Sequence, residues 1–144
     1  MKIIQVVGRS NTGKTTLIQQ LVPELGKQGR VGVIKHLADH NYRLDPSKDT
    51  TEFFSAGAAI TVGIDAEKSV AIVRSAGLSP MLALLDGQGM DFAVIEGFKT
   101  EKFPRIVVGD LVTDGEVLRN PSVADVIAKL DRFADYRRPE SAIR

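Results

Sequence analysis

The sequence predicts an α/β fold in which helices cover both faces of a mainly parallel sheet, together with an antiparallel hairpin. The segment from Gly8 to Thr15 reads Gly-Arg-Ser-Asn-Thr-Gly-Lys-Thr and directly follows the apolar run Ile3 to Val7. The spacing G-x-x-x-x-G-K-[ST] after a strand is that of a phosphate-binding P-loop. Short apolar runs also alternate with stretches of helical periodicity along the chain. Together these patterns predict a three-layer α/β/α P-loop NTPase.

Each part of the P-loop suits the binding of a nucleoside triphosphate. Gly8 and Gly13 allow a tight loop whose backbone amides converge on the α- and β-phosphates. Lys14 can reach the β- and γ-phosphates, and the Thr15 hydroxyl can ligate a Mg²⁺ ion that keeps several waters. The helix N-terminus adds a positive field. We favour this interpretation over a glycine-containing turn with an incidental surface lysine.

The composition fits one soluble domain. The chain has 144 residues, of which 43% are hydrophobic, enough for a single core. We expect a nucleotide-binding domain over residues 1–135 and a loose C-terminal tail over 136–144. The absence of cysteine excludes disulfides and thiolate metal sites and suits the cytoplasm. A net charge of +1 does not mark the surface for nucleic acid or membrane, and no leader or apolar run of about 20 residues is evident.

The first half of the chain predicts a β-α-β unit. A helix is expected over about 14–27, with Leu17, Leu21 and Leu25 facing the sheet. The apolar run 31–34 predicts a buried parallel strand, joined to the first strand by a right-handed crossover.

A long polar stretch, residues 35–48, separates this unit from the next helix. Loops of this length are commonly functional or disordered. Asp49 and Glu52 have the spacing of a capping box, which predicts that Asp49 is the N-cap of a short helix that Gly57 closes.

The remaining elements follow from turn and capping signals. Ser79-Pro80 and Asn120-Pro121 each read as an N-cap followed by proline, which predicts two helices. The first of these helices should extend through Leu85 to Gly87 or Gly89. The second should bury an apolar face of Val123, Ile127, Leu130 and Phe133. Strands are expected over 59–64 and 69–73, as a hairpin, and over 91–95 and 105–108.

Glu96 is the candidate for an acidic residue at the metal. It follows the apolar run Phe92 to Ile95, so it lies at the carboxyl end of a strand, where ligands bind in open α/β sheets. There it could hold Mg²⁺ through a water or orient the attacking water, and Gly97 could let the backbone approach the γ-phosphate. An acid at a strand end can also be merely solvated, but a P-loop requires an acidic partner for its metal.

The polar stretch offers further candidates. Asp45 could approach Mg²⁺ or the γ-phosphate and Lys48 could contact a phosphate, as in a switch segment. The alternative is that Asp45-Pro46 forms a turn and Asp49 caps a helix, with no ligand involved. Both interpretations stay open for Asp45, and the cap is favoured for Asp49.

Two histidines and a second basic stretch complete the candidates. His36 and His40 are four residues apart, but no third zinc ligand is evident, and Lys35-His36 better suits an anionic ligand. The stretch from Phe98 to Arg105 is too narrow for nucleic acid, which favours a solvated loop or a protein contact.

The candidate residues are then as follows. Lys14 and Glu96 are the candidate catalytic residues, and Thr15, Glu96 and Asp45 are the candidate Mg²⁺ ligands. The candidate nucleotide-binding residues are Gly8, Arg9, Ser10, Asn11, Thr12, Gly13, Lys14, Thr15, Thr16, Lys35 and Lys48.

These segments, taken in order along nearly the whole chain, resemble one family. The similarity lies in the P-loop, Lys35-His36, the segment 45–50 (Asp-Pro-Ser-Lys-Asp-Thr), Ala56-Gly57-Ala58, and 96–99 (Glu-Gly-Phe-Lys) with Pro104-Arg105. The chain resembles the MobB family, the molybdopterin-guanine dinucleotide biosynthesis adapters. The resemblance implies a small P-loop GTP-binding protein, related to signal-recognition and metallochaperone GTPases, that is often a homodimer. It also implies weak GTPase activity and a partner guanylyltransferase that joins GMP to molybdopterin, with molybdopterin as a further ligand.

The chain departs from that family's pattern in the polar stretch. Ser47 stands where members often have glycine, and fewer histidines follow Lys35-His36. An Asn-Lys-x-Asp motif for guanine is absent from the sequence, so the choice of GTP over ATP follows from the resemblance. An arginine finger is not identifiable; Arg9 is the nearest candidate, and slow hydrolysis is expected. The alternatives are a small-molecule kinase that uses ATP and a nucleotide-dependent binding module that does not hydrolyse.

Overall fold

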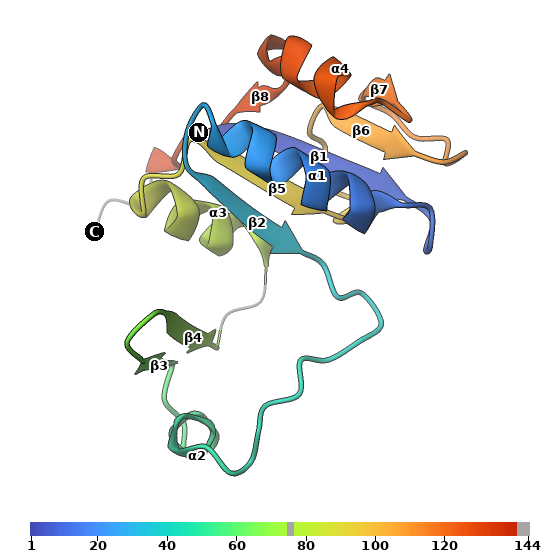
Figure 1. The fold of residues 1–144 in the computed structure, drawn as a ribbon. Coiled ribbons are helices and arrows are strands. Elements are labelled where there is room, and N and C mark those ends of the chain that lie inside the picture. The colour runs from blue at the N-terminus through green and yellow to red at the C-terminus, as the bar shows by residue number, and fades with distance from the viewer. Residues whose placement is uncertain (75–76, 141–144) are drawn as a thin grey trace. The chain divides into compact units, whose positions relative to one another are not determined.

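The computed structural model of the chain describes residues 1–74 and 77–140. The helices and strands are β1 (Lys2–Gly8), α1 (Lys14–Gly26), β2 (Val31–Lys35), α2 (Asp49–Ser55), β3 (Ile60–Ile64), β4 (Ser69–Val73), α3 (Leu78–Gly87), β5 (Phe92–Glu96), β6 (Arg105–Val108), β7 (Glu116–Arg119), α4 (Val123–Ala128), the 3₁₀ helix η1 (Leu130–Arg132) and β8 (Ala134–Asp135) (Figure 1). The chain forms two compact units. The sheet unit comprises Met1–His36 and Met81–Arg144, and the hairpin unit comprises Leu37–Pro80.

The sheet unit is built on one mainly parallel sheet, as predicted. Its strand order is β2-β5-β1-β6-β7, and β8 pairs antiparallel with the first residues of β1. The parallel register aligns Glu96 at the end of β5 with Val6 of β1 on one side and with Lys35 of β2 on the other. The sheet therefore brings the carboxyl ends of β1, β2 and β5 to one edge, where β1 leads into the P-loop.

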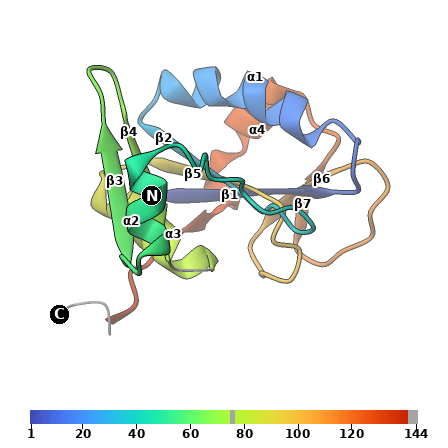
Figure 2. The ribbon, with the colours of Figure 1, turned by 90° about the horizontal axis from the view of Figure 1, so that it is seen from below.

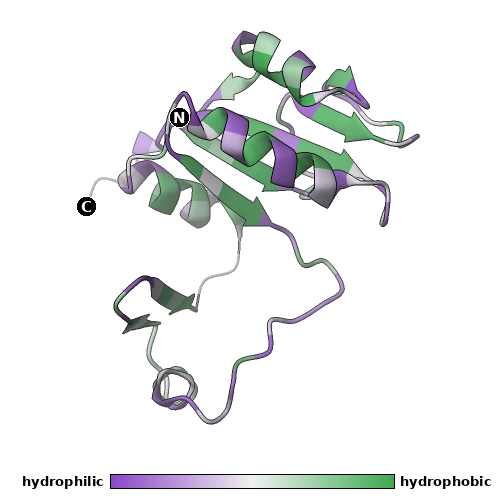
Figure 3. Cartoon of the chain, viewed as in Figure 1, coloured by the Kyte–Doolittle hydropathy of each residue, from purple (hydrophilic) through white to green (hydrophobic). Residues whose placement is uncertain are grey.

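Helices cover both faces of this sheet, which confirms the α/β/α prediction. Figure 2 shows α1 and α4 on one face and α3 on the other. Leu21 and Leu25 of α1 are fully buried as predicted, Ile18 is buried beside them, and Leu17 is partly buried. The strands between the helices are mainly hydrophobic (Figure 3). The core on the α1 face contains Ile4, Val6, Ile18, Leu21, Leu25, Phe92, Val94, Ile106, Val108, Val126 and Phe133.

Strand β2 is less buried than predicted. The strand is parallel, but β5 lies between it and β1, and β2 forms an edge of the sheet. Its residue Val33 is 47% exposed, so the strand is not fully buried. A short apolar run does not show whether a strand lies at the edge or in the centre of a sheet. Here that position is set by β5, which comes from much later in the chain and pairs between β1 and β2.

The predicted N-caps of three helices are wrong by one or two residues. The N-cap of α2 is Lys48, which makes no capping side-chain bond, so Asp49 is the first helical residue rather than the cap. Helix α3 begins at Leu78, before the expected cap at Ser79. The N-cap of α4 is Ser122 rather than Asn120. Exact helix ends depend on which local hydrogen bonds form, and several capping residues stand close together at each of these sites.

Helix α4 is also shorter than predicted. It ends at Ala128, and the 3₁₀ helix η1 follows it, so Leu130 and Phe133 lie outside the α-helix. Phe133 is nevertheless buried in the core. The helical spacing correctly identified which residues pack against the core, but the α-helix ends before Leu130.

Two strands, β7 and β8, were not predicted. Each is short: β7 has four residues and pairs with the preceding strand β6, and β8 has two residues and pairs with β1 at the other end of the chain, so neither shows a clear local pattern. Beyond β8, the Tyr136 amide donates to the Met1 carbonyl at 2.8 Å, and Arg138 pairs with Asp86. The domain boundary after residue 135 stays a prediction.

The hairpin unit contains α2 and the predicted antiparallel hairpin. Strands β3 and β4 pair with Val62 opposite Ala71, which confirms the hairpin. Arg74 lies over the ring of Phe54 at 3.9 Å from its centroid and donates to the Phe54 carbonyl. Among the residues that the structure describes, there is no helix of the length and hydropathy that a membrane crossing requires.

Candidate nucleotide-binding site

The P-loop connects β1 to α1 at the carboxyl edge of the sheet. Gly13 is the N-cap of α1 with φ of 98°, and Asn11 also has a positive φ of 59°. At Gly8, a Cβ would lie 2.3 Å from the Val108 carbonyl oxygen, which no side chain could tolerate. The loop is thus packed against the end of β6, and both glycines of the motif are required by its backbone.

Lys14 folds back onto the P-loop. Its Nζ donates to the carbonyls of Gly8 at 3.1 Å and Arg9 at 2.7 Å. Burial lowers the pKa of Lys14 from its usual value; the carboxylate of Glu96 opposes this shift, and nearby Lys99 and Lys35 add to it. The ammonium group therefore lies against the loop backbone, and its contact with the β- and γ-phosphates stays a prediction.

Glu96 lies between Thr15 and Lys35, two of the residues predicted from the sequence. Glu96 Oε2 is 3.5 Å from Thr15 Oγ1, and Oε1 is 3.5 Å from Lys35 Nζ. The Glu96 side chain is only 12% exposed. Strand pairing explains this proximity, because β1 and β2 flank β5 and all three strands end at this edge.

A hydroxyl and a carboxylate at this spacing can serve a hard cation. Mg²⁺ is typically held by one or two protein oxygens together with phosphates and water, and Thr15 with Glu96 fits that pattern. Among the described residues there is no cluster of three or more His, Asp or Glu that could form an all-protein metal cage.

The chain after Glu96 turns through two residues of positive φ, Gly97 at 92° and Phe98 at 54°. Positive φ is rare for a bulky side chain such as phenylalanine. Gln5, fully buried in β1, holds this turn: its Nε2 donates to the carbonyls of Gly97 at 2.9 Å and Phe98 at 2.8 Å. Gln5 was not predicted as a site residue. The available signal was its polar side chain in the otherwise apolar run Ile3 to Val7.

Packing against His36 explains the glycine at position 97. The Gly97 amide donates to the Val6 carbonyl at 3.0 Å, and a Cβ at this position would lie 3.0 Å from His36 Cβ. The imidazole of His36 stacks on the Phe98 ring, with centroids 4.4 Å apart. The sequence also suggested that Gly97 gives the backbone access to the γ-phosphate, and this role stays a prediction. The second histidine, His40, belongs to the hairpin unit.

Arg105 in the second basic stretch is a buried structural residue. Its guanidinium donates to the carbonyls of Lys99 at 3.1 Å and Phe103 at 3.2 Å, to that of Glu101, and to Thr113 Oγ1 at 3.1 Å. Only 3% of the residue is exposed. Arg105 therefore fixes the loop between β5 and β6, in a stretch for which the sequence suggested a solvated loop or a protein contact.

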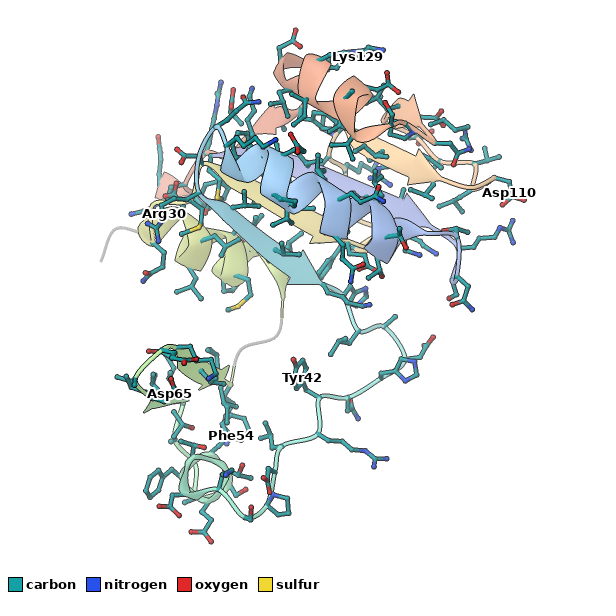
Figure 4. All side chains as sticks on the ribbon, viewed as in Figure 1. Arg30, Tyr42, Phe54, Asp65, Asp110 and Lys129 are labelled. Atoms are coloured by element: carbon teal, nitrogen blue, oxygen red, sulfur yellow. The ribbon has the colours of Figure 1, made fainter. Side chains whose placement is uncertain are left out.

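The outer part of the P-loop is exposed. Arg9 Nε lies 3.2 Å from Asp110 Oδ1 in the loop after β6, where Figure 4 shows Asp110 extending from the sheet unit. The Thr12 hydroxyl donates to the Arg9 carbonyl at 2.8 Å. The predicted binding residues Ser10, Asn11 and Thr16 are exposed.

Asp45 and Lys48 belong to the hairpin unit. The Asp45 carboxylate accepts the Ser47 hydroxyl at 2.7 Å and the Ser47 amide at 2.9 Å, which together lower its pKa. This is the turn that the sequence offered as the alternative interpretation. The roles of Asp45 at Mg²⁺ and of Lys48 at a phosphate stay predictions.

A cavity of about 350 Å³ adjoins the P-loop on the side away from β2. Its lining residues come from the start of α1 and from the ends of β6 and β7: Gly13, Thr16, Leu17, Gln20, Val108, Asn120 and Pro121. Sequence reasoning took Asn120 for a helix cap and missed this cavity. A larger cavity, of about 490 Å³, lies near Phe103 and Val117 at the amino ends of β6 and β7, and contains no predicted site residue.

Solved structures share this fold. The crystal structure of Bacillus subtilis MobB matches with a TM-score of 0.71 over 94% of this chain and 100% of that one, at 21% identity. A MobB homologue from Bacillus stearothermophilus matches with a TM-score of 0.60 over 91% of this chain and 94% of that one, at 24% identity. At these identities the similarity establishes the fold alone.

Sequence comparison supports a closer relationship. A relative from Methanocaldococcus jannaschii is 32% identical over 127 residues, which are 88% of this chain and 51% of that protein. The molybdopterin-guanine dinucleotide biosynthesis adapter protein of Escherichia coli is 35% identical over 106 residues, 69% of this chain and 60% of that protein. The chain thus spans about half the length of the archaeal relative and three fifths of the bacterial one.

The family model described as molybdopterin guanine dinucleotide synthesis protein B matches residues 3–130. This range contains the P-loop, Glu96 and every strand of the parallel order from β2 to β7. Since the match covers most of the chain and agrees with the relatives and with the fold, the chain belongs to the molybdopterin guanine dinucleotide synthesis protein B family.

Proposed function

We propose that this protein is a cytoplasmic GTP-binding adapter with weak GTPase activity, which assists the attachment of GMP to molybdopterin. The observation that carries the proposal is the convergence of Lys14, Thr15 and Glu96 at one edge of the sheet. The family relationship supports the pathway, because the E. coli relative is named as a biosynthesis adapter.

Each residue has a separate task at the nucleotide. The P-loop amides and Lys14 bind the phosphates, and Lys14 stabilises charge on the β- and γ-phosphates. Thr15 and Glu96 would hold Mg²⁺, which would neutralise charge on the phosphates. Lys35, 3.5 Å from Glu96 Oε1, holds the carboxylate in place and adds positive charge near the phosphates.

Hydrolysis is slow because the nearby arginines have other partners. Arg105 is committed to backbone carbonyls, and Arg9 pairs with Asp110. An arginine finger contributes a factor of about 10³ to 10⁵ in GTPases. A partner protein that supplied one would therefore control turnover.

The protein acts as a homodimer and works with the molybdenum cofactor guanylyltransferase, with molybdopterin as a further ligand. Support for the dimer comes from the hairpin face, formed by Ile60, Val62 and Ile64 on one side of β3. These side chains alternate along the strand and are 58%, 51% and 80% exposed. Neighbouring exposed apolar residues of this kind commonly mark protein interfaces.

Two variants test the nucleotide site. Lys14→Ala should abolish binding of GTP with Mg²⁺ in calorimetric titration, because the phosphates lose their main cationic contact. Glu96→Gln should keep GTP affinity within about 3-fold and slow hydrolysis by about 10- to 100-fold, since the metal loses a charged partner. Lys27→Ala, at the far end of α1, is the matched control and should change neither quantity.

Distinct results would overturn distinct parts of this function. No heat with GTP or ATP would contradict nucleotide binding altogether. A phosphorylated product from a small-molecule acceptor and ATP would replace the adapter with a kinase. Normal cofactor maturation with Glu96→Gln would show that binding alone is required.

A further inference from the structure

The cavity beside the P-loop has the size and position of a subsite for the nucleotide base. Thr16 and Gln20 line it from α1, and Val108 and Asn120 line it from the ends of β6 and β7. Gly13 belongs both to this cavity and to the P-loop. A nucleotide whose phosphates lie on the loop can therefore extend its nucleoside into a space of about 350 Å³, within the range of small-molecule pockets.

Asn120 is fixed in one orientation at this cavity. Its backbone has φ of 44°, a conformation that asparagine tolerates better than most residues. Its Oδ1 accepts the Gly109 amide at 2.7 Å. A backbone amide can only donate, so the oxygen and not the nitrogen of the side chain must face Gly109. The group left for a ligand is Nδ2, a pure donor, which has no acceptor among the residues that the structure describes.

The neighbouring loop holds this arrangement rigid. Arg119 donates to the carbonyls of Gly109 at 2.8 Å and Leu111 at 3.0 Å, and Glu116 accepts from Arg119 Nε at 3.0 Å. The Asn120 amide also continues the strand pairing by donating to the Val107 carbonyl at 2.9 Å. A donor that is held before the ligand arrives discriminates well, because it cannot rotate to present an acceptor.

We propose that this cavity binds the purine base and that Asn120 Nδ2 selects a 6-oxopurine by donating to its O6. Guanine and hypoxanthine carry a carbonyl acceptor at this position, whereas adenine carries an amino group that would face Nδ2 donor to donor. This assignment rests on the proposed nucleotide binding at the P-loop. It gives the chain a preference for GTP over ATP without the Asn-Lys-x-Asp motif.

Calorimetric titration of the full chain with Mg²⁺ and GTP, ITP or ATP tests the assignment directly. ITP keeps O6 and lacks the 2-amino group of GTP. GTP and ITP should bind within about 3-fold of each other, and ATP about 10-fold or more weakly, as expected for exchanging one well-oriented hydrogen bond for a repulsive contact.

The isosteric variant Asn120→Asp tests the residue. One carboxylate oxygen can still accept the Gly109 amide, and aspartate also tolerates positive φ, but the other oxygen is now an acceptor. GTP affinity should fall by about 10-fold and ATP affinity should rise, which reverses the preference. Gln28→Glu adds the same charge beyond the far end of α1 and should leave the GTP to ATP ratio unchanged. Circular dichroism checks that Asn120→Asp remains folded.

The outcomes separate this inference from the function on which it rests. Equal affinity of the native chain for GTP and ATP would overturn the role of Asn120 and leave nucleotide binding intact. Binding of ITP as weak as that of ATP would also overturn it, because recognition would then use the 2-amino group. No binding of any of the three would overturn both proposals.

Discussion

At the scale of single residues, the buried side chain of Gln5 sets the path of the chain after Glu96. It is the donor to two successive carbonyls in a turn where both residues have positive φ. Such a conformation persists only where the surroundings determine it. Gln5 therefore connects β1, which leads into the P-loop, with the segment that follows the acidic residue.

The variant Gln5→Met should be less stable than the native chain by about 1–2 kcal/mol, because the carbonyls of Gly97 and Phe98 lose their buried donor. The loss of Oε1, which has no partner among the described residues, offsets part of this cost. Urea denaturation followed by circular dichroism measures the difference. Gln19→Met, on the exposed side of α1, is the control and should stay within about 0.5 kcal/mol. Equal stability of both variants would contradict the role of Gln5.

At the scale of secondary structure elements, α4 shows how a helix start is decided. Ser122 Oγ accepts the Asp125 amide at 3.1 Å, and the Asp125 carboxylate accepts the Ser122 amide at 2.9 Å. This reciprocal capping box satisfies two free amides, whereas Asn120 uses its side chain on Gly109. The helix begins where more of its unpaired groups find partners.

This capping box makes the stability of the protein depend on pH. The Ser122 amide, together with the Ser122 hydroxyl, holds the pKa of Asp125 below its usual range. Because the pKa is lower in the folded than in the unfolded chain, this stabilisation is complete above the unfolded pKa and is lost as pH falls through the folded pKa. Asp125→Asn should therefore lower the urea midpoint at neutral pH, with the difference shrinking in acid below the lowered pKa.

Two comparisons complete that experiment. Ser122→Ala should cost about 1 kcal/mol at neutral pH, as for other N-cap serines. For Asp114→Asn, in an exposed loop, the difference in urea midpoint from the native chain should not shrink in acid. A difference between Asp125→Asn and the native chain that is constant over this pH range would contradict the capping role of the carboxylate.

At the scale of the whole molecule, the chain divides into a sheet unit with a large core and a hairpin unit with very little buried surface. Helix α2 contains no buried residue, and Thr61 is the buried residue of β3. A unit of this size cannot easily be stable on its own apolar contacts. The hairpin face of Ile60, Val62 and Ile64 therefore has a physical reason to be covered, as the proposed homodimer would do.

Light scattering coupled to size exclusion tests the dimer. The native chain should have twice its monomer mass, and the double variant Val62→Glu/Ile64→Glu should be a monomer, because four charges would have to be buried in the two-fold interface. Val112→Glu changes a side chain that is 92% exposed in the sheet unit and should leave the mass unchanged. A dimer that survives the double variant would exclude the hairpin face as its interface.

Much of the fold was predictable because it depends on short-range patterns. The P-loop follows from a fixed spacing of glycines, lysine and threonine, and β5 with Glu96 follows from an apolar run that ends in an acid. The hairpin also follows from two β-rich runs separated by a short polar stretch. By contrast, β7 is a short, partly exposed strand, and β8 is a two-residue strand that pairs with β1 at the other end of the chain. The insertion of β5 between β1 and β2 cannot be predicted from either strand alone.

The sequence by itself determined the parallel α/β class, and it predicted a phosphate-binding loop with Lys14, Thr15 and Glu96 as the residues for its chemistry. Only the tertiary structure decided what surrounds them. It buried Gln5 under the turn at Phe98, turned Arg105 into an anchor for carbonyls, and fixed Asn120 beside a cavity by a bond to Gly109. The physical reason is that a polar side chain takes its role from the groups it can reach, and strand order sets which groups those are.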